Sequence, residues 1–103
     1  IAASFAESLR AEVIVVGFNA EEAMTFPDNS SDFVKEMNAS LSTSTLNHVQ
    51  VICYTQSLNK KQIVSLGKEL RAPFELMWSC YEGGERMCRQ CESCKRFYRA
   101  MGN

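Results

Sequence analysis

The stretch EVIVVG, Glu12–Gly17, is a continuous β-branched run that a glycine ends, and it predicts a buried strand. A second run of this kind, VQVICY, covers Val49–Tyr54 and predicts a second strand. A helix is predicted before the first strand, because apolar residues recur there at helical spacing. These residues are Ile1, Ala2, Phe5, Ala6 and Leu9.

Helices are also predicted after each strand. Ser30 or Ser31 can cap the first of them, and Asn59 can cap the second, KKQIVSLGKEL, which Ala72-Pro73 ends. Strands that alternate with helices predict an α/β fold with helices on the faces of a parallel sheet. A cysteine-rich appendix and a terminal helix from about Glu92 follow. The helix predicted after the first strand has the apolar face Phe33, Val34, Met37 and Leu41. The helix predicted after the second strand has the face Ile63, Leu66, Gly67 and Leu70.

Composition limits the classes of partner. The 103 residues are 46% hydrophobic and carry a net charge of −1 without a long run of either sign, so charge alone implies neither a nucleic acid nor a membrane surface. No apolar run approaches the roughly 20 residues of a membrane span, and the opening IAASFAESLRAE has no signal-peptide pattern. We therefore expect a soluble cytoplasmic protein. Because the chain starts without Met inside a helical pattern, we also expect it to be the later part of something longer.

Four of the five cysteines lie in SCYEGGERMCRQCESC, with the spacing Cys80-x7-Cys88-x2-Cys91-x2-Cys94. A reducing compartment and the short spacing argue against disulfides. The last three cysteines match the start of a bacterial ferredoxin run, but the fourth cysteine followed by proline is missing. Two-residue gaps let the backbone present successive sulfurs to a tetrahedral ion. The spacing therefore favours structural zinc over an iron–sulfur cluster.

A zinc ion with four protein ligands has no open position for water, so we expect it to hold the fold and perform no chemistry. Four thiolates and zinc carry a local charge of about −2, which nearby basic residues can compensate. That interpretation is favoured over binding of RNA or a nucleotide phosphate, and nucleic acid is not an expected partner. Cys53, the fifth cysteine, is interpreted as a small buried hydrophobe rather than a catalytic thiol. In segment 80–103 the basic residues Arg86, Arg89, Lys95, Arg96 and Arg99 outnumber the acidic Glu82, Glu85 and Glu92.

The order of segments and the cysteine signature resemble the 7-cyano-7-deazaguanine synthase family of queuosine and archaeosine biosynthesis. The stretches that carry the resemblance are IAASFAESL, GFNAEE, FPD, NKKQIVSLGKELRAP and SCYEGGERMCRQCESC, which together span essentially the whole chain. The resemblance implies the C-terminal part of an N-type ATP pyrophosphatase of the PP-loop superfamily. Residues 1–79 would then be the later part of a Rossmann-like, adenine nucleotide alpha hydrolase-like parallel sheet. Residues 80–103 would be a zinc-binding segment with a terminal helix.

For activity, the resemblance implies an ATP-dependent ligase. Such an enzyme activates the carboxylate of 7-carboxy-7-deazaguanine as an adenylate, lets ammonia displace AMP, and dehydrates the resulting amide to the nitrile with a second ATP. The implied cofactors are structural zinc, ATP and magnesium, which shields the phosphates. The family's phosphate-binding S-G-G-x-D-S loop is missing from this sequence, so we expect the chain to be inactive by itself.

Three smaller departures from the family pattern concern the substrate contacts. Residues 26–30 read F-P-D-N-S, where many members have Y-P-D-C-R. Arg89 follows the second cysteine, where glycine is usual, and Phe97 stands where an arginine is common. The four cysteines themselves are intact.

Five residues are candidates for contacts with the substrate or its phosphates. Asn19 follows the first predicted strand, where α/β sheets bind ligands. We expect it either to contact the nucleobase or ribose of the substrate or to form a local Asx turn. Asp28 can accept paired hydrogen bonds from the guanine-like N–H edge of a deazapurine, or it is a helix N-terminal acid. Lys60 is expected at the start of a helix, where it either binds a phosphate or remains exposed to solvent. Trp78 and Tyr81 stack on the base or, as we favour, pack against the metal loop.

Two other functions stay open beside the ligase. The missing phosphate loop motivates a free-standing zinc-bearing binding module, and a related ATP pyrophosphatase with another substrate is the third reading. The expected partners are a small-molecule nucleobase substrate, ATP and ammonia, without a membrane, and a homodimer stays open. No residue is assigned to catalysis.

Overall fold

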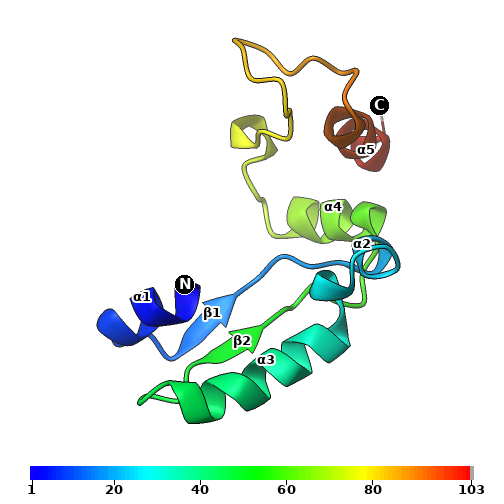
Figure 1. Cartoon of the computed structure of the whole chain (residues 1–103). Coiled ribbons are helices and arrows are strands. Elements are labelled where there is room, and N and C mark those ends of the chain that lie inside the picture. The colour runs from blue at the N-terminus through cyan, green and yellow to red at the C-terminus, as the bar shows by residue number, and fades with distance from the viewer. Residues whose placement is uncertain (103) are drawn as a thin grey trace. The chain divides into compact units, whose positions relative to one another are not determined.

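The computed structural model describes residues 1–102 (Figure 1). They form two compact units, Ile1–Leu58 and a second unit that begins at Asn59. The division predicted between residues 79 and 80 separates the α/β part from the zinc-binding segment, so it is defined differently from these compact units. It stays a prediction. In the described residues, each helix is too short or too polar to cross a membrane. The elements are α1 (Ala2–Ser8), β1 (Val13–Val15), α2 (Ala20–Ala23), the 3₁₀ turn η1 (Pro27–Asn29), α3 (Ser31–Ser44), β2 (Gln50–Ile52), α4 (Lys60–Glu69), the 3₁₀ turn η2 (Phe74–Leu76) and α5 (Glu92–Met101).

The sheet of the first unit consists of β1 and β2, which pair in parallel with Ile14 opposite Val51. Backbone hydrogen bonds continue the pairing on both sides of the strands. The Val16 N–H donates to the Ile52 carbonyl at 3.0 Å, and the Gln50 N–H donates to the carbonyl of residue 12 at 3.0 Å. The predicted α/β class with a parallel sheet is confirmed.

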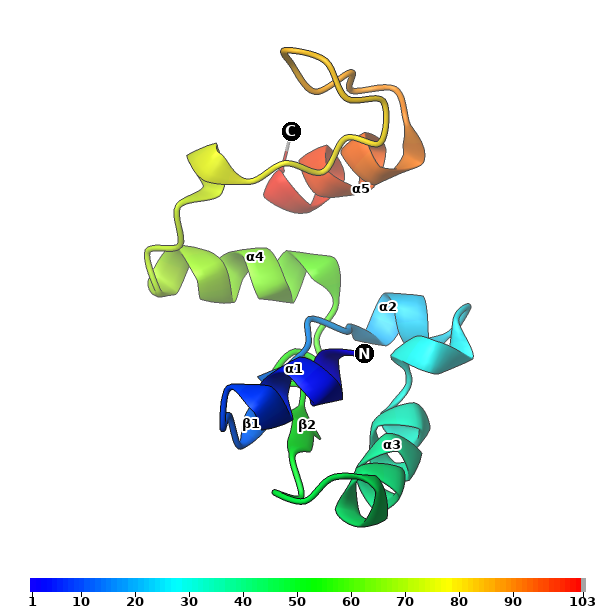
Figure 2. The same ribbon diagram turned by 60° about the vertical axis from the view of Figure 1, so that its left-hand side comes forward.

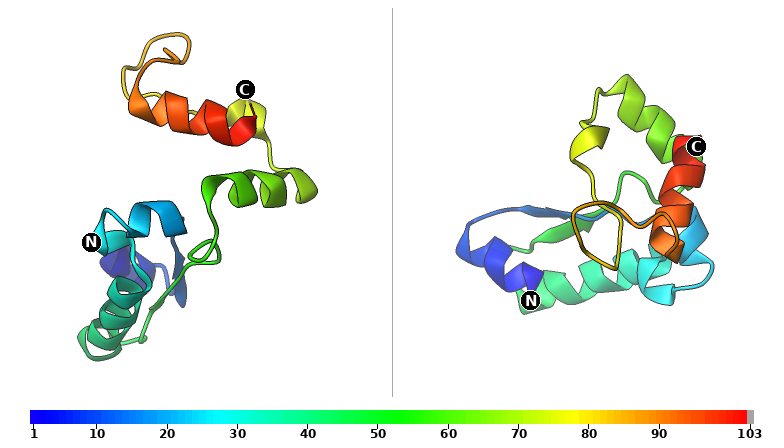
Figure 3. Two further views of the ribbon diagram at one scale, coloured as in Figure 1. Left: turned by 90° about the vertical axis from the view of Figure 1, so that its right-hand side faces the viewer. Right: turned by 90° about the horizontal axis from the view of Figure 1, so that it is seen from above.

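Helices α1 and α3 cover one face of this sheet (Figure 3, left). Side chains of a strand alternate between the two faces, and Ile14 is the residue of β1 that packs against the core. Val49, just before β2, is 1% exposed and is the most buried residue of this core. The buried members of the core are Ala6, Leu41, Val49 and Val51.

The predicted burial of the first strand and of its preceding helix is wrong for several residues. Val13 and Val15 are 40% and 62% exposed, and Phe5 and Leu9 on α1 are 66% and 76% exposed. Only Ala6 of α1 is buried. Parallel sheets normally have helices on both faces, whereas the first unit covers only the face that Ile14 occupies. The sequence pattern therefore predicts that more apolar residues are buried than the structure buries.

Helix α3 begins as predicted, with Ser30 as its N-cap. The Ser30 hydroxyl oxygen accepts the Phe33 N–H at 3.1 Å. Further along the helix, the Asn38 side chain binds both backbone polar groups of Val51, donating to its carbonyl at 3.0 Å and accepting from its N–H at 2.7 Å. The residues on either side of Val51 bind β1, so Val51 faces the outer edge of β2. Asn38 closes that edge.

We expect Asn38→Ala to lower the free energy of unfolding by about 2 to 4 kcal/mol, because it leaves the N–H and C=O of the buried Val51 unpaired. Urea unfolding of the full-length protein measures the change. Asn47→Ala is the matched control, since Asn47 makes one exposed hydrogen bond, to the Ala11 carbonyl at 3.0 Å. Equal effects of the two substitutions would show that Asn38 does not close the edge.

The second unit contains α4 and α5, which contact each other (Figure 2). Helix α4 starts at the predicted cap. The Asn59 side-chain oxygen accepts the Gln62 N–H at 2.9 Å, and the Gln62 side chain accepts the Asn59 N–H at 2.9 Å. These reciprocal bonds form a capping box.

The predicted end of α4 agrees with the structure, and its apolar face needs correction. The helix ends at Glu69 with Leu70 as its C-cap, before Ala72-Pro73, and Arg71 then adopts a left-handed φ of 55°. Val64 is the buried residue, whereas Leu70 is 72% exposed. Gly67 does belong to the packed face, since a Cβ on it would lie 2.6 Å from the Phe74 ring.

Candidate metal centre

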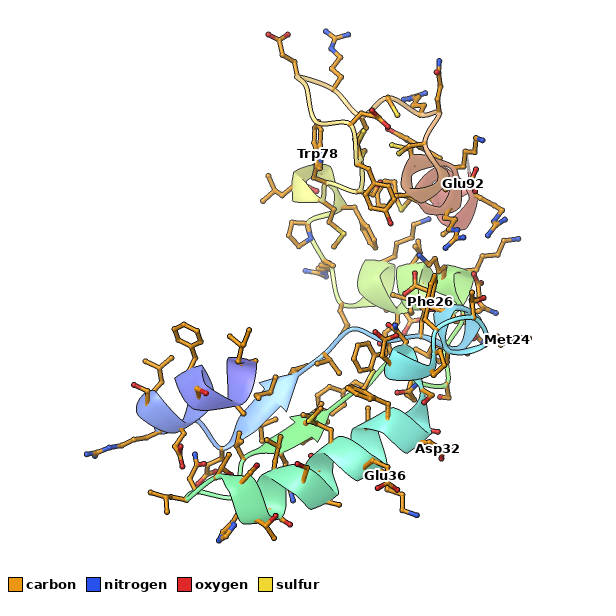
Figure 4. The ribbon with its side chains drawn as sticks, viewed as in Figure 1. Met24, Phe26, Asp32, Glu36, Trp78 and Glu92 are labelled. Atoms are coloured by element: carbon orange, nitrogen blue, oxygen red, sulfur yellow. The ribbon has the colours of Figure 1, made fainter. Side chains whose placement is uncertain are left out.

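The cysteine cluster is formed by the loop after η2 and by the start of α5. Cys80 and Cys88 lie in the loop, Cys91 is the N-cap of α5, and Cys94 lies in its first turn. Figure 4 labels Trp78 and Glu92 at the two ends of this loop, with sulfur-bearing side chains between them. The four Sγ atoms all lie within 4.8 Å of one another. The four cysteines predicted as ligands are thus brought together.

Left-handed residues let the loop turn back on itself. Gly83 and Gly84 have φ angles of 71° and 87°, which glycine adopts without strain. Arg89 has a φ of 60° although it carries a side chain. Its guanidinium carbon lies 4.6 Å from the centroid of the Tyr98 ring, a cation–π contact that offsets part of the strain. The left-handed φ explains why glycine suits position 89.

Backbone N–H groups point at the cysteine sulfurs. Cys80 Sγ accepts the Cys88 N–H at 3.4 Å, Cys88 Sγ accepts the Cys91 N–H at 3.3 Å, and Cys91 Sγ accepts the Cys94 N–H at 3.5 Å. Hydrogen bonds to a sulfur favour its thiolate form. The backbone is therefore folded to hold negative sulfurs.

The thiols differ in their affinity for protons. The backbone N–H groups of Tyr81 and Cys94 lower the pKa of the Cys91 thiol to about 6. The Cys88 N–H lowers the pKa of Cys80. Burial raises the pKa of Cys94, which is 0% exposed, to about 11. At neutral pH Cys91 is ready to bind a cation, whereas Cys94 still carries its proton.

The donor set fits a metal ion such as zinc. Zinc binds thiolate sulfur at about 2.3 Å, which places the sulfurs of a tetrahedral site about 3.8 Å apart. The observed separations, all within 4.8 Å, need only a small contraction to reach that value. In the described chain the group consists of cysteines alone, without a histidine or carboxylate. Four thiolates occupy all positions of such an ion, so the centre suits structure rather than catalysis.

We expect the affinity for zinc to rise with pH, because all four ligands bind as thiolates. With a pKa of about 11, the Cys94 thiol must release its proton on binding at pH 7. Below pH 6 the Cys91 thiolate is also protonated, so the affinity should fall more steeply there. Calorimetric titration in two buffers of different ionisation enthalpy measures the protons released. Equal zinc affinity at pH 5.5 and pH 8, with no proton release, would contradict this expectation.

Trp78 and Tyr81 flank the centre. The Trp78 indole N–H donates to the Cys80 carbonyl at 3.1 Å, which agrees with the favoured packing of this residue against the metal loop. Its side chain is nevertheless 51% exposed, and Tyr81 is 79% exposed. A stacking role toward a planar base stays a prediction for both.

The other candidate residues are distributed over both units. Asn19 is 4% exposed, and its side-chain oxygen accepts the Glu22 N–H at 3.0 Å, so it caps α2 as a local alternative to ligand binding. Asp28 lies on η1, which contacts α2, and its carboxylate accepts the Asn29 side-chain N–H at 3.1 Å. Lys60 is the first residue of α4 in the second unit. Their substrate and phosphate roles stay predictions.

Sequence reasoning missed the amide side chains that join distant segments of the first unit. Asn38 is one, and Gln56, which donates to the Asn29 carbonyl at 2.9 Å, is another. Both bonds depend on a tertiary arrangement, so the local sequence gives no signal for them.

The fold and the site define an α/β protein with a parallel sheet and a four-cysteine centre that can hold a metal ion. The chain belongs to the family described as "Queuosine biosynthesis protein QueC", whose model matches residues 1–103. The resemblance noted in the sequence is confirmed.

Curated relatives with the name 7-cyano-7-deazaguanine synthase match nearly the whole chain. The relative from Pelotomaculum thermopropionicum is 62% identical over 100 residues, covering 97% of this chain and 45% of its own length. That from Carboxydothermus hydrogenoformans is 60% identical over 102 residues, or 99% and 47%. That from Methanosarcina mazei is 50% identical over 103 residues, or 100% and 45%. The chain therefore spans about half the length of the curated relatives it matches.

Proposed function

We propose that this chain serves an ATP-dependent ligase that converts 7-carboxy-7-deazaguanine and ammonia to 7-cyano-7-deazaguanine. The observation that supports the proposal is the match of residues 1–103 to the QueC family, together with relatives named for that product. The carboxylate substrate, ammonia and ATP follow from the resemblance and are part of the proposal. Magnesium would accompany the ATP.

The proposed reaction has to make an unreactive carboxylate electrophilic. A carboxylate is a poor electrophile until one of its oxygens becomes part of a leaving group, which adenylation by ATP provides. Ammonia then forms the C–N bond as the C–O bond to AMP breaks, and a second ATP activates the amide oxygen for the loss that leaves a nitrile. In this scheme Asp28 binds the N–H edge of the base and Lys60 binds phosphate.

The four cysteines would hold zinc, which stabilises the second unit and takes no part in the transfer. No disulfide joins cysteines within the described residues, which suits a reducing compartment, and we propose that the protein is cytoplasmic.

We further propose that the parallel pair belongs to a larger Rossmann-like sheet of the PP-loop type. Asn38 binds both backbone polar groups of Val51 at the outer edge of β2, which favours continuation of the sheet beside β1. Val13 and Val15, both on β1, leave an apolar face exposed, which helices cover in a complete parallel sheet. The relatives are about twice as long as this chain, which leaves ample length for further strands and helices.

A charged residue on β1 tests the extended sheet. In the full-length protein we expect Val15→Asp to lower the free energy of unfolding by about 2 to 4 kcal/mol, because a covered sheet face buries the carboxylate. Leu46→Asp is the matched control, since Leu46 is 92% exposed and lies in a loop. Thermal and urea unfolding compare the two variants. A Val15→Asp variant as stable as the control would mean that this face stays open to water.

The proposed reaction is tested with the full-length protein, 7-carboxy-7-deazaguanine, ATP and ammonia. The expected result is the nitrile, detected by mass spectrometry, together with release of AMP. AMP release without nitrile would favour a related ATP pyrophosphatase that acts on another carboxylate. Binding of the base without any use of ATP would favour a binding module.

A further inference from the structure

Two hydrogen bonds connect the loop after β2 with the candidate substrate residue Asp28. The Gln56 side chain donates through Nε2 to the Asn29 carbonyl at 2.9 Å, across 27 residues of sequence. The Asn29 side chain in turn donates to the Asp28 carboxylate at 3.1 Å. Asp28 and Asn29 belong to η1, the turn that follows Phe26, which Figure 4 labels. The tie therefore holds the turn that carries Asp28.

The loop that carries Gln56 is itself anchored. The Phe18 carbonyl, beyond the end of β1, accepts the Thr55 hydroxyl at 2.6 Å and the Cys53 thiol at 3.3 Å. The Leu58 carbonyl accepts the Ala20 N–H at 3.0 Å. Gln56 thus lies between two attachments to the segment that follows β1. These attachments fix the backbone from which its side chain reaches the turn.

The Gln56 amide is an unfavourable choice if it serves stability alone. Its Nε2 faces a carbonyl, so the side chain cannot turn its oxygen to that partner. The oxygen, Oε1, is buried and accepts no hydrogen bond from the described residues. A buried acceptor without a donor is destabilising, whereas an apolar side chain of similar shape avoids that penalty. The amide therefore points to a function other than stability.

We propose that Gln56 is a positioning residue, which holds η1 so that the Asp28 carboxylate faces the N–H edge of a nitrogen heterocycle. This inference rests on the proposed function, since it assigns Gln56 to the binding of the same base. Gln56 acts through the Asn29 carbonyl and does not touch the substrate. Carboxylates recognise two neighbouring N–H groups only in the correct orientation, so the held turn improves affinity.

A double-mutant cycle in the full-length protein tests the proposal. Calorimetric titration with 7-carboxy-7-deazaguanine compares the wild type, Gln56→Met, Asp28→Asn and the double variant. Gln56→Met should weaken binding about twofold to tenfold, the effect of one neutral hydrogen bond. The melting temperature should change little, because the loss of the donor to the Asn29 carbonyl is offset by removal of the buried, unpaired Oε1. In the Asp28→Asn background the same change should have no further effect, because the two residues act as one unit. Equal weakening in both backgrounds would overturn the proposal.

Two further variants separate the alternatives. Gln56→Glu keeps an acceptor but loses the donor to Asn29, so it should weaken binding as Gln56→Met does; full affinity in Gln56→Glu would overturn the positioning role. Gln50→Met is the matched control, since Gln50 is exposed at the opposite end of β2, and its affinity should stay unchanged. If the wild type binds the base but Gln56→Met binds equally well, only this inference fails. If the wild type does not bind the base, the proposed function fails with it.

Discussion

Replacing Cys91 by serine in the full-length protein is expected to abolish tight zinc binding and to unfold the second unit. Structural zinc contributes on the order of 10 kcal/mol or more to the folding of small sites, and three remaining thiolates do not saturate the ion. Serine keeps the local structure, because the Cys91 sulfur accepts the Cys94 N–H at 3.5 Å and serine is a preferred N-cap. The substitution therefore leaves the N-cap of α5 intact, so the loss of stability reports the missing zinc ligand.

Metal analysis and thermal unfolding measure this effect. We expect about one zinc ion and no labile sulfide per wild-type chain, as four thiolates in a closed site require. Cys53→Ser is the control, since the Cys53 thiol donates to the Phe18 carbonyl at 3.3 Å and a serine hydroxyl can replace it. An unchanged melting curve for Cys91→Ser would show that the metal has no structural role. A brown wild-type protein with labile sulfide would identify an iron–sulfur cluster.

The features that the sequence predicts well depend on neighbouring residues. Ser30, one of two predicted caps for α3, and Asn59 both make the expected side-chain bonds, because a cap needs only its own residue and an N–H within the next turn. The start of α5 at Glu92 follows in the same way. The cysteine cluster was also predictable, since two-residue gaps constrain three of the sulfurs by local geometry alone.

Burial was harder to predict because it depends on segments far away in the chain. The β-branched run that contains Val13 and Val15 correctly indicated a strand, but its side chains are covered only if another layer packs on that face. The same holds for Phe5 on α1. Periodicity identifies the side of an element that is suited to burial, and the tertiary structure decides whether that side is buried.

Long-range polar ties were beyond sequence reasoning for a different reason. Asn38 and Gln56 each bind backbone groups far along the chain, and an amide in a helix or loop is usually solvated. Only the pairing of β1 with β2 and the packing of α3 bring their partners within reach. These ties set the edge of the sheet and the position of η1, so they connect the fold to the proposed substrate site.

Asp28→Asn is expected to weaken binding of 7-carboxy-7-deazaguanine by about thirtyfold to a thousandfold. If Asp28 binds the N–H edge of the base, the substitution loses a charge-assisted hydrogen bond and places a donor against a donor, a loss of roughly 2 to 4 kcal/mol. The Asn29 side chain donates a hydrogen bond to the Asp28 carboxylate at 3.1 Å. An asparagine oxygen at position 28 can accept the same bond, so its loss does not contribute to the measured effect. Zinc content and ATP affinity should stay the same.

Asp32→Asn distinguishes substrate binding from a purely structural effect. Asp32 is an exposed acid in the first turn of α3 (Figure 4), where a negative charge stabilises the helix by about 0.3 to 1 kcal/mol. Its removal should lower the melting temperature slightly and leave affinity for the base unchanged. Asp28→Asn should show the opposite pattern, with a large loss of affinity and little change in melting temperature. If Asp28→Asn behaves like Asp32→Asn, then Asp28 only stabilises the turn before α3, and the base is recognised by other residues.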